Sequence, residues 1–110
     1  MKGFLRESKA QMGCSAMNIR RLVLDVDKAI ARPSLIELAQ AICSCPGVEG
    51  ANITVTEIDV ETVGTNITIE GQALDYDVIQ QAIESVGAVV HSVDQIVCGD
   101  RLIEEVKRMR

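Results

Sequence analysis

The segment ANITVTEIDVETVGTNITIE, residues 51–70, decides the fold that the sequence predicts. In residues 51–60, Ile53 and Val55 alternate with polar residues, as in a strand that buries one face. Residues 65–70 repeat the alternation, with two isoleucines on the inward side. Two such strands joined by a short polar connection predict a β-hairpin.

The sequence also predicts the register of this hairpin. A turn centred on Thr62 would place Thr54 opposite Glu70 and Val55 opposite Ile69. The apolar pair would then lie on the buried face of the sheet, and the polar pair on the other face.

Outward from the hairpin, periodicity and helix-end signals predict the remaining elements. Ser34 and Glu37 form a capping box at the start of the first helix. The expected elements are a strand at 19–27, a helix at 34–45, a helix at 76–87, a strand at 88–98 and a short basic helix at 100–109.

The element order predicts an α+β fold of the ferredoxin-like type, βαββαβ. Right-handed crossovers give a four-stranded antiparallel sheet, with strands one and three central and both helices on one face. The short C-terminal helix would follow it. Residues 17–110 would form this single domain, and residues 1–16 a disordered N-terminal extension. The inward side of the strand at 88–98 stays open between Val89/Val93/Val97 and Val90/Ile96.

Composition narrows the possible partners. The net charge is −5, and residues 34–99 contain no Lys or Arg. Phosphate binding needs clustered basic side chains, and single-strand nucleic acid is stacked on aromatic rings, of which this chain has two. We therefore expect no nucleic-acid or anionic-membrane surface. No run of about 18 apolar residues exists, and the spacing of the four cysteines is not that of a secreted scaffold, so we expect a cytoplasmic protein.

The side of the sheet that the helices leave open should be acidic. Asp25 and Glu70 are expected to be neighbours there, with His91, Ser92 or Asp94 close to Asp25. Converging carboxylates suit Ca²⁺ or Mg²⁺, which take oxygen ligands. Glu57, Asp59 and Glu61 could form a second cation site at the hairpin tip. The alternative is that these residues are solvated charges, paired with Arg21 or with Arg20 of another subunit.

The cysteines and the single histidine carry weaker signals. Cys43 and Cys45 are too closely spaced for a typical zinc pair, so buried, inert thiols are the expectation. His91 could act as a general base beside Asp25 or Asp94, although a hydrogen-bonded structural role is the commoner one for such a residue.

Several motifs, in order, resemble an archaeal family of unknown function, domain-of-unknown-function family 211. They are RLVLDV (21–26), GVEGANITVTEID (47–59), ITIEG (67–71) and HSVDQIV (91–97). The resemblance implies a ferredoxin-like fold and a homo-oligomer, with a closed ring among the arrangements, but no established activity. Bound Ca²⁺ would be compatible with its acidic positions, here Asp25, Glu57, Asp59, Glu70 and Asp94. This chain departs from the family pattern at residues 27–31, where a histidine that could supply a ligand is missing.

Three functions remain open from the sequence. The first is an oligomeric binding module that holds a divalent cation or a small effector on its acidic sheet face or at subunit boundaries. The second is a self-assembling structural protein without a ligand. The third is an enzyme that uses His91 with a carboxylate, and it ranks last because nothing places a nucleophile, a base and an oxyanion donor together.

Overall fold

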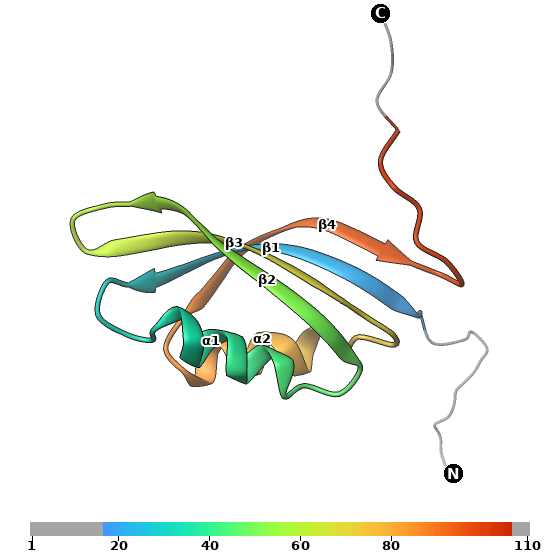
Figure 1. The fold of residues 1–110 in the computed structure, drawn as a ribbon, viewed down its shortest axis with the longest axis horizontal. Helices are drawn as coiled ribbons and strands as arrows, with labels where there is room; N and C mark the ends of the chain where they lie inside the picture. The colour runs from blue at the N-terminus through green and yellow to red at the C-terminus, as the bar shows by residue number, and fades with distance from the viewer. Residues whose placement is uncertain (1–16, 107–110) are drawn as a thin grey trace, which may run out of the picture.

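The computed structural model describes residues 17–106, and these form one four-stranded sheet covered by two helices. The elements, in chain order, are β1 (Ile19–Ala29), α1 (Leu35–Cys43), β2 (Val48–Ile58), β3 (Thr62–Gly71), α2 (Tyr76–Ser85) and β4 (Val89–Cys98). The strand order is β2-β3-β1-β4, and every neighbouring pair is antiparallel. Both helices lie on the same side of the sheet (Figure 1). The predicted ferredoxin-like βαββαβ order, with strands one and three central, is confirmed.

An aliphatic core fills the space between the sheet and the helices. The central strand β1 contributes alternate side chains, Leu22, Leu24 and Val26, as its period-2 pattern predicts. The other fully buried core side chains come from β3 and from both helices: Ile67, Ile69, Leu38, Ile42, Ile79 and Ile83. Because the helices cover only one side, the polar residues between these positions lie on the opposite side of the sheet, which we call the open face.

The ends of the helices follow the capping signals. The Ser34 hydroxyl accepts a hydrogen bond from the Glu37 backbone N–H, and the Glu37 carboxylate accepts one from the Ser34 N–H, so the predicted capping box is formed. The second of these bonds lowers the pKa of Glu37. The Asp75 carboxylate likewise accepts from the first turn of α2. These caps satisfy backbone donors that a helix start leaves unpaired.

The hairpin forms, but the predicted register is wrong. Thr54 lies opposite Asn66 and not Glu70, and Val55 lies opposite Thr65 and not Ile69. The chain turns earlier than expected, where the Asp59 N–H donates to the Thr62 carbonyl at 2.8 Å. The register is displaced there by an even number of residues, so each side chain keeps its predicted face.

Strand β4 follows neither of the two alternating patterns along its whole length. Its pairing with β1 shifts register at three places, and such irregularities turn side chains from one face to the other. Val90 packs against the core, whereas the buried Val97 lies outside the core cluster. The inward side of this strand therefore changes along its length.

The predicted C-terminal helix is not formed in the described part of the chain. Residues 101–106 contain no helical turn, and they leave the sheet on the side away from the helices (Figure 1). The prediction for residues 1–16 and the end of the predicted helix lie outside the described residues. Among residues 17–106, no helix is long and apolar enough to cross a membrane.

Candidate functional site

A network of ion pairs surrounds Arg21 of β1 at one end of the open face. Among residues 17–106, no other arginine forms an ion pair on this face. Arg21 lies opposite Glu70 in the β1–β3 register, and its Nε donates to Glu70 Oε2 at 2.7 Å. On the other side, Nη1 lies 3.4 Å from Oε1 of Gln95 in β4. The Arg21 side chain is only 15% exposed, and Glu70 and Gln95 contact its guanidinium from β3 and β4.

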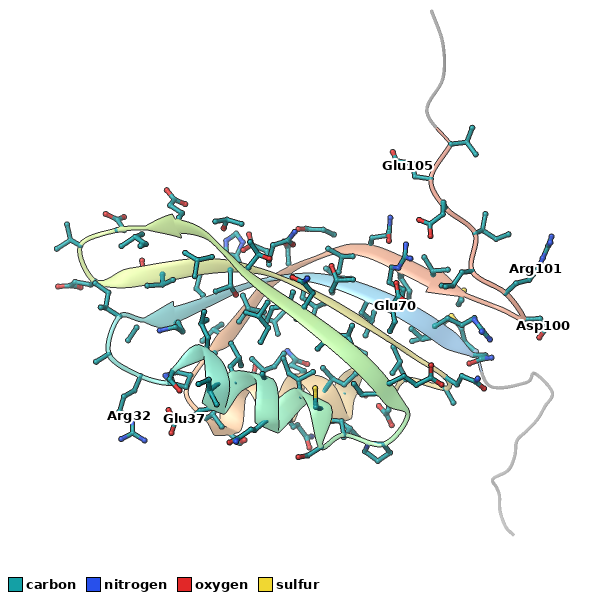
Figure 2. All side chains as sticks on the ribbon, viewed as in Figure 1. Arg32, Glu37, Glu70, Asp100, Arg101 and Glu105 are labelled. Atoms are coloured by element: carbon teal, nitrogen blue, oxygen red, sulfur yellow. The ribbon has the colours of Figure 1, made fainter. Side chains whose placement is uncertain are left out.

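The segment after β4 completes this network. We call residues Asp100–Val106 the strap, and Arg21, Glu70, Gln95 and Val97 the seat. Glu104 of the strap accepts two hydrogen bonds from Arg21, at 2.8 Å from Nη1 and 2.8 Å from Nη2. This is the bidentate geometry that matches a planar guanidinium to a carboxylate. Figure 2 shows Glu70 on the sheet below the strap, and Asp100, Arg101 and Glu105 along it.

The two charges of the strap contact stabilise each other's ionised forms. Hydrogen bonds from Arg21 lower the pKa of Glu104, and hydrogen bonds to Glu104 and then to Glu70 raise the pKa of Arg21 further above its ordinary value. A lowered carboxyl pKa means that the contact is favourable at neutral pH and is lost as the pH falls through that lowered value.

The structure separates two carboxylates that the sequence was expected to bring together. Asp25 lies opposite Asn66 on β3, whereas Glu70 lies opposite Arg21. Four residues of β1 separate the two positions, a distance of about 13 Å along a strand. Glu70 is paired with Arg21, which is the alternative that the sequence analysis left open, so the expected Asp25–Glu70 neighbourhood is wrong.

Asp25 instead lies beside the single histidine. Its Oδ2 is 3.5 Å from Nδ1 of His91, and both side chains are substantially exposed, at 39% and 68%. Asp94 accepts a hydrogen bond from the Ser92 hydroxyl at 2.7 Å and lines the hollow next to the strap. The expected approach of His91 to Asp25 is confirmed, and Ser92 is the register partner of Asp25 on β4.

The two carboxylates of the hairpin tip, Glu57 and Asp59, have different surroundings. Asp59 accepts a hydrogen bond from the Val60 N–H within the turn, at 2.8 Å. Glu57 lies across Gly64 from Asp27 of β1. A methyl group on Gly64 would lie 3.6 Å from Asp27 Oδ1 and 3.6 Å from Glu57 Cβ, so the glycine leaves room between two acidic residues. We call Asp25, Asp27 and Glu57 the acidic end of the open face.

A metal site within one copy of the chain is not found among residues 17–106. No three histidine, cysteine, aspartate or glutamate side chains there lie close enough together to hold an ion. The cation ligands expected from the sequence are distributed over the acidic end, the hairpin turn, the seat and, for Asp94, the hollow beside the strap. Their role as ligands remains a prediction.

A shallow hollow lies on the β2–β3 side of the seat. It has a volume of about 380 Å³ and is lined by Glu49, Gly50, Ala51, Asn52, Thr68 and Glu70. The carboxylates of Glu49 and Glu70 share this lining with apolar atoms.

The cysteines differ from the expected buried pair. Cys45 is buried, and burial raises the pKa of its thiol, with Cys43 contributing less. Cys43 and Cys98 are exposed, so the expectation of buried cysteines holds for Cys45 alone among these three. The three form no disulfide in the described part of the chain.

Comparison with known proteins places the chain in a family. A family model described as "Uncharacterized ArCR" matches residues 20–110. The chain belongs to the DUF211 family. It is also 47% identical, over 89 residues, to the uncharacterized protein MJ0319 of Methanocaldococcus jannaschii, an alignment that covers 81% of this chain and 91% of that protein. The resemblance seen in the sequence motifs is thus confirmed, and DUF211 membership by itself assigns no activity.

The strap contact is the feature of the site that sequence reasoning missed. Its participants were visible, since Arg21 is an outward basic residue of β1 and Glu104 is an acidic residue of the tail. What the sequence lacks is a periodic signal for an irregular segment that folds back across 83 residues of chain.

Proposed function

We propose that this DUF211 protein is a non-catalytic binding module that self-associates and holds a divalent cation, Ca²⁺ or Mg²⁺, or a small polar effector where copies meet at the open face. The observation that carries the proposal is a polar, acidic sheet face that the helices of the described chain leave uncovered, bordered by two edge strands. Self-assembly without a ligand is the alternative, and the cation experiment below separates the two.

The edge strands support self-association. Strands β2 and β4 are 11 and 10 residues long and stand at the two ends of the sheet order, so each has one side without a strand neighbour in the described chain. Long edge strands present unpaired backbone groups and attract further strands. Exposed aliphatic side chains on β4, Val89, Val93 and Ile96, add apolar area to that edge.

The carboxylates support a cation shared between copies. Asp25, Asp27 and Glu57 share the acidic end, and none of them has an Arg or Lys partner among the described residues. Among residues 17–106, one copy supplies no cluster of three such ligands. A second copy would therefore have to complete the oxygen coordination that Ca²⁺ requires.

Val93→Lys should weaken self-association by about tenfold or more, because a charge on an edge strand opposes strand addition. Light scattering over a concentration series measures the mass. The matched control is Val60→Lys, which adds the same charge at the exposed hairpin tip. A parent protein that is monomeric at tens of micromolar, or equal effects of the two substitutions, would contradict self-association through β4.

Asp25→Asn and Glu57→Gln should each weaken Ca²⁺ binding by about tenfold or more, because affinity follows the number of charged ligands. Calorimetry with Ca²⁺ and with Mg²⁺ measures it. Glu70→Gln is the control, since Arg21 already engages that carboxylate and its loss should change cation affinity little. If the parent binds neither ion, the cation part of the proposal is wrong and self-assembly without a ligand remains.

A further inference from the structure

The seat presents the planar fork of a guanidinium to a carboxylate of the strap. Glu70 and Gln95 hold Arg21 from two neighbouring strands, and the outward edge of the guanidinium, Nη1 and Nη2, points to the strap. An arginine oriented in advance loses little freedom when a carboxylate binds, and its planar fork selects carboxylates over other acceptors. The seat therefore has the properties of a binding site, and Glu104 occupies it.

The strap is attached to the sheet mainly through that one carboxylate. Among residues 17–106, the hydrogen bonds that join the strap to the sheet are those between Glu104 and Arg21. Gly99, just before the strap, has a φ of +112° and open space around it, so the chain can change direction there. A short segment held at one point can leave and return without unfolding the domain.

An apolar position accompanies the carboxylate. Val97 of the seat is only 7% exposed, and together with Ile96 and Ile103 it lines a hollow of about 330 Å³ between β4 and the strap. Leu102, Ile103 and Val106 of the strap are all exposed, so the hollow covers Ile103 only in part. The segment that fits the seat is thus an extended peptide with an aliphatic residue directly before a glutamate.

We propose that the seat is a peptide-recognition site whose partner in the assembled protein is the strap of a second copy, with the chain's own strap as its resident competitor. The seat includes Gln95 and Val97 of the edge strand β4, so a copy that adds at this edge brings a second strap within reach. Proximity of that kind raises the effective concentration of a weak peptide contact into a useful range. The choice of partner rests on the self-association proposed above, whereas the recognition site does not.

The recognition site is tested on the full-length chain with a synthetic peptide of residues 100–106, DRLIEEV. The Arg21 Nε–H signal in NMR, and the backbone signals of Gln95 and Val97, report occupancy of the seat. In the Glu104→Gln chain, whose own strap competes less, the peptide should bind about tenfold more tightly than in the parent, as expected for a charge-assisted bidentate contact. Arg21→Gln should abolish binding.

A peptide that itself carries Glu104→Gln keeps this test independent of how the Arg21 variant folds. It should bind the Glu104→Gln chain about tenfold more weakly than the unaltered peptide does. Equal binding of the two peptides, or equal affinity of the parent and Glu104→Gln chains for the unaltered peptide, would overturn the recognition site.

Exchange between copies is tested by mixing two variants. The Arg21→Gln chain keeps its strap but lacks a working seat, and the Glu104→Gln chain keeps its seat but has a weakened strap. Only in the mixture can an intact strap meet an intact seat, so the Arg21 signal of the labelled Glu104→Gln chain should move toward its position in the parent. No movement at concentrations where light scattering detects oligomers would overturn the exchange. If the peptide binds but the parent is monomeric, the recognition site is supported. The proposal that a second copy supplies the partner strap is then wrong, together with self-association.

Discussion

Gly71→Ala should lower the free energy of unfolding by about 3 kcal/mol or more, or prevent folding, although it adds a single methyl group. Gly71 is buried at the end of β3, opposite the start of β2. A Cβ there would overlap the carbonyl group of Gly47 and come within 3.0 Å of the Glu49 backbone nitrogen. The Gly47 carbonyl cannot rotate aside cheaply, because it accepts a hydrogen bond from the Gln72 N–H at 3.0 Å.

Gly50→Ala is the matched control for this substitution. Gly50 lies in β2 and pairs with Glu70, one residue before Gly71, but nothing lies within 4 Å of a Cβ added to it. Alanine is favoured over glycine in a strand interior, so this variant should be neutral or slightly stabilised. Urea denaturation compares the two midpoints at constant slope. Equal midpoints would show that the backbones at Gly47 and Gly71 can separate without cost.

The faces of the sheet could be predicted from the sequence because they depend only on a period of two. Leu22, Leu24 and Val26 alternate with polar residues, and a strand turns every second side chain to the same side. The register of the hairpin depends instead on where the chain turns. The turn at Asp59–Thr62 contains no Asn-Gly or Asp-Gly pair, so the sequence does not mark its position.

This difference explains why the candidate site was predicted only in part. Both Asp25 and Glu70 were placed correctly on the open face, but their separation follows from the register between β1 and β3. His91 was placed beside Asp25 because antiparallel β4 must pass that position. The pairing of Glu70 with Arg21 was recognised only as an alternative, since sequence does not show which of two nearby charges a carboxylate meets.

The strap was mispredicted for a related reason. Leu102, Ile103 and Val106 have spacings that suit one side of a helix, and this pattern suggested the helix at 100–109. So short a helix is marginal in water unless its apolar side packs on something. In the structure these side chains stay exposed, so apolar packing does not support a helix there. The ion pair between Glu104 and Arg21 attaches the segment to the sheet instead.

Ile67→Ala should lower the free energy of unfolding by about 2–5 kcal/mol, as large-to-small substitutions in a core do. Ile67 is fully buried in the central strand β3 and lies opposite Leu24 of β1, which is also fully buried. Ile58→Ala is the control. Ile58 ends β2 with a side chain that is 73% exposed, and its truncation should change stability by no more than about 0.5 kcal/mol. Denaturant midpoints that fall equally in the two variants would contradict the assignment of the core.

A double-mutant cycle extends this prediction to the pair. Because Ile67 and Leu24 are register partners on the buried face, Ile67→Ala and Leu24→Ala should be non-additive by about 0.5–3 kcal/mol. A single domain has only about 5–15 kcal/mol to lose, so the double variant should be close to unfolding at room temperature. The seat takes Arg21 and Glu70 from the same two central strands, and its loss in these variants would follow global unfolding. Glu104→Gln should raise the equilibrium constant of unfolding by no more than about tenfold, the size of its effect at the seat, because it acts on an exposed side chain outside the core. Comparing the two kinds of variant therefore separates recognition at the seat from stability of the sheet that carries it.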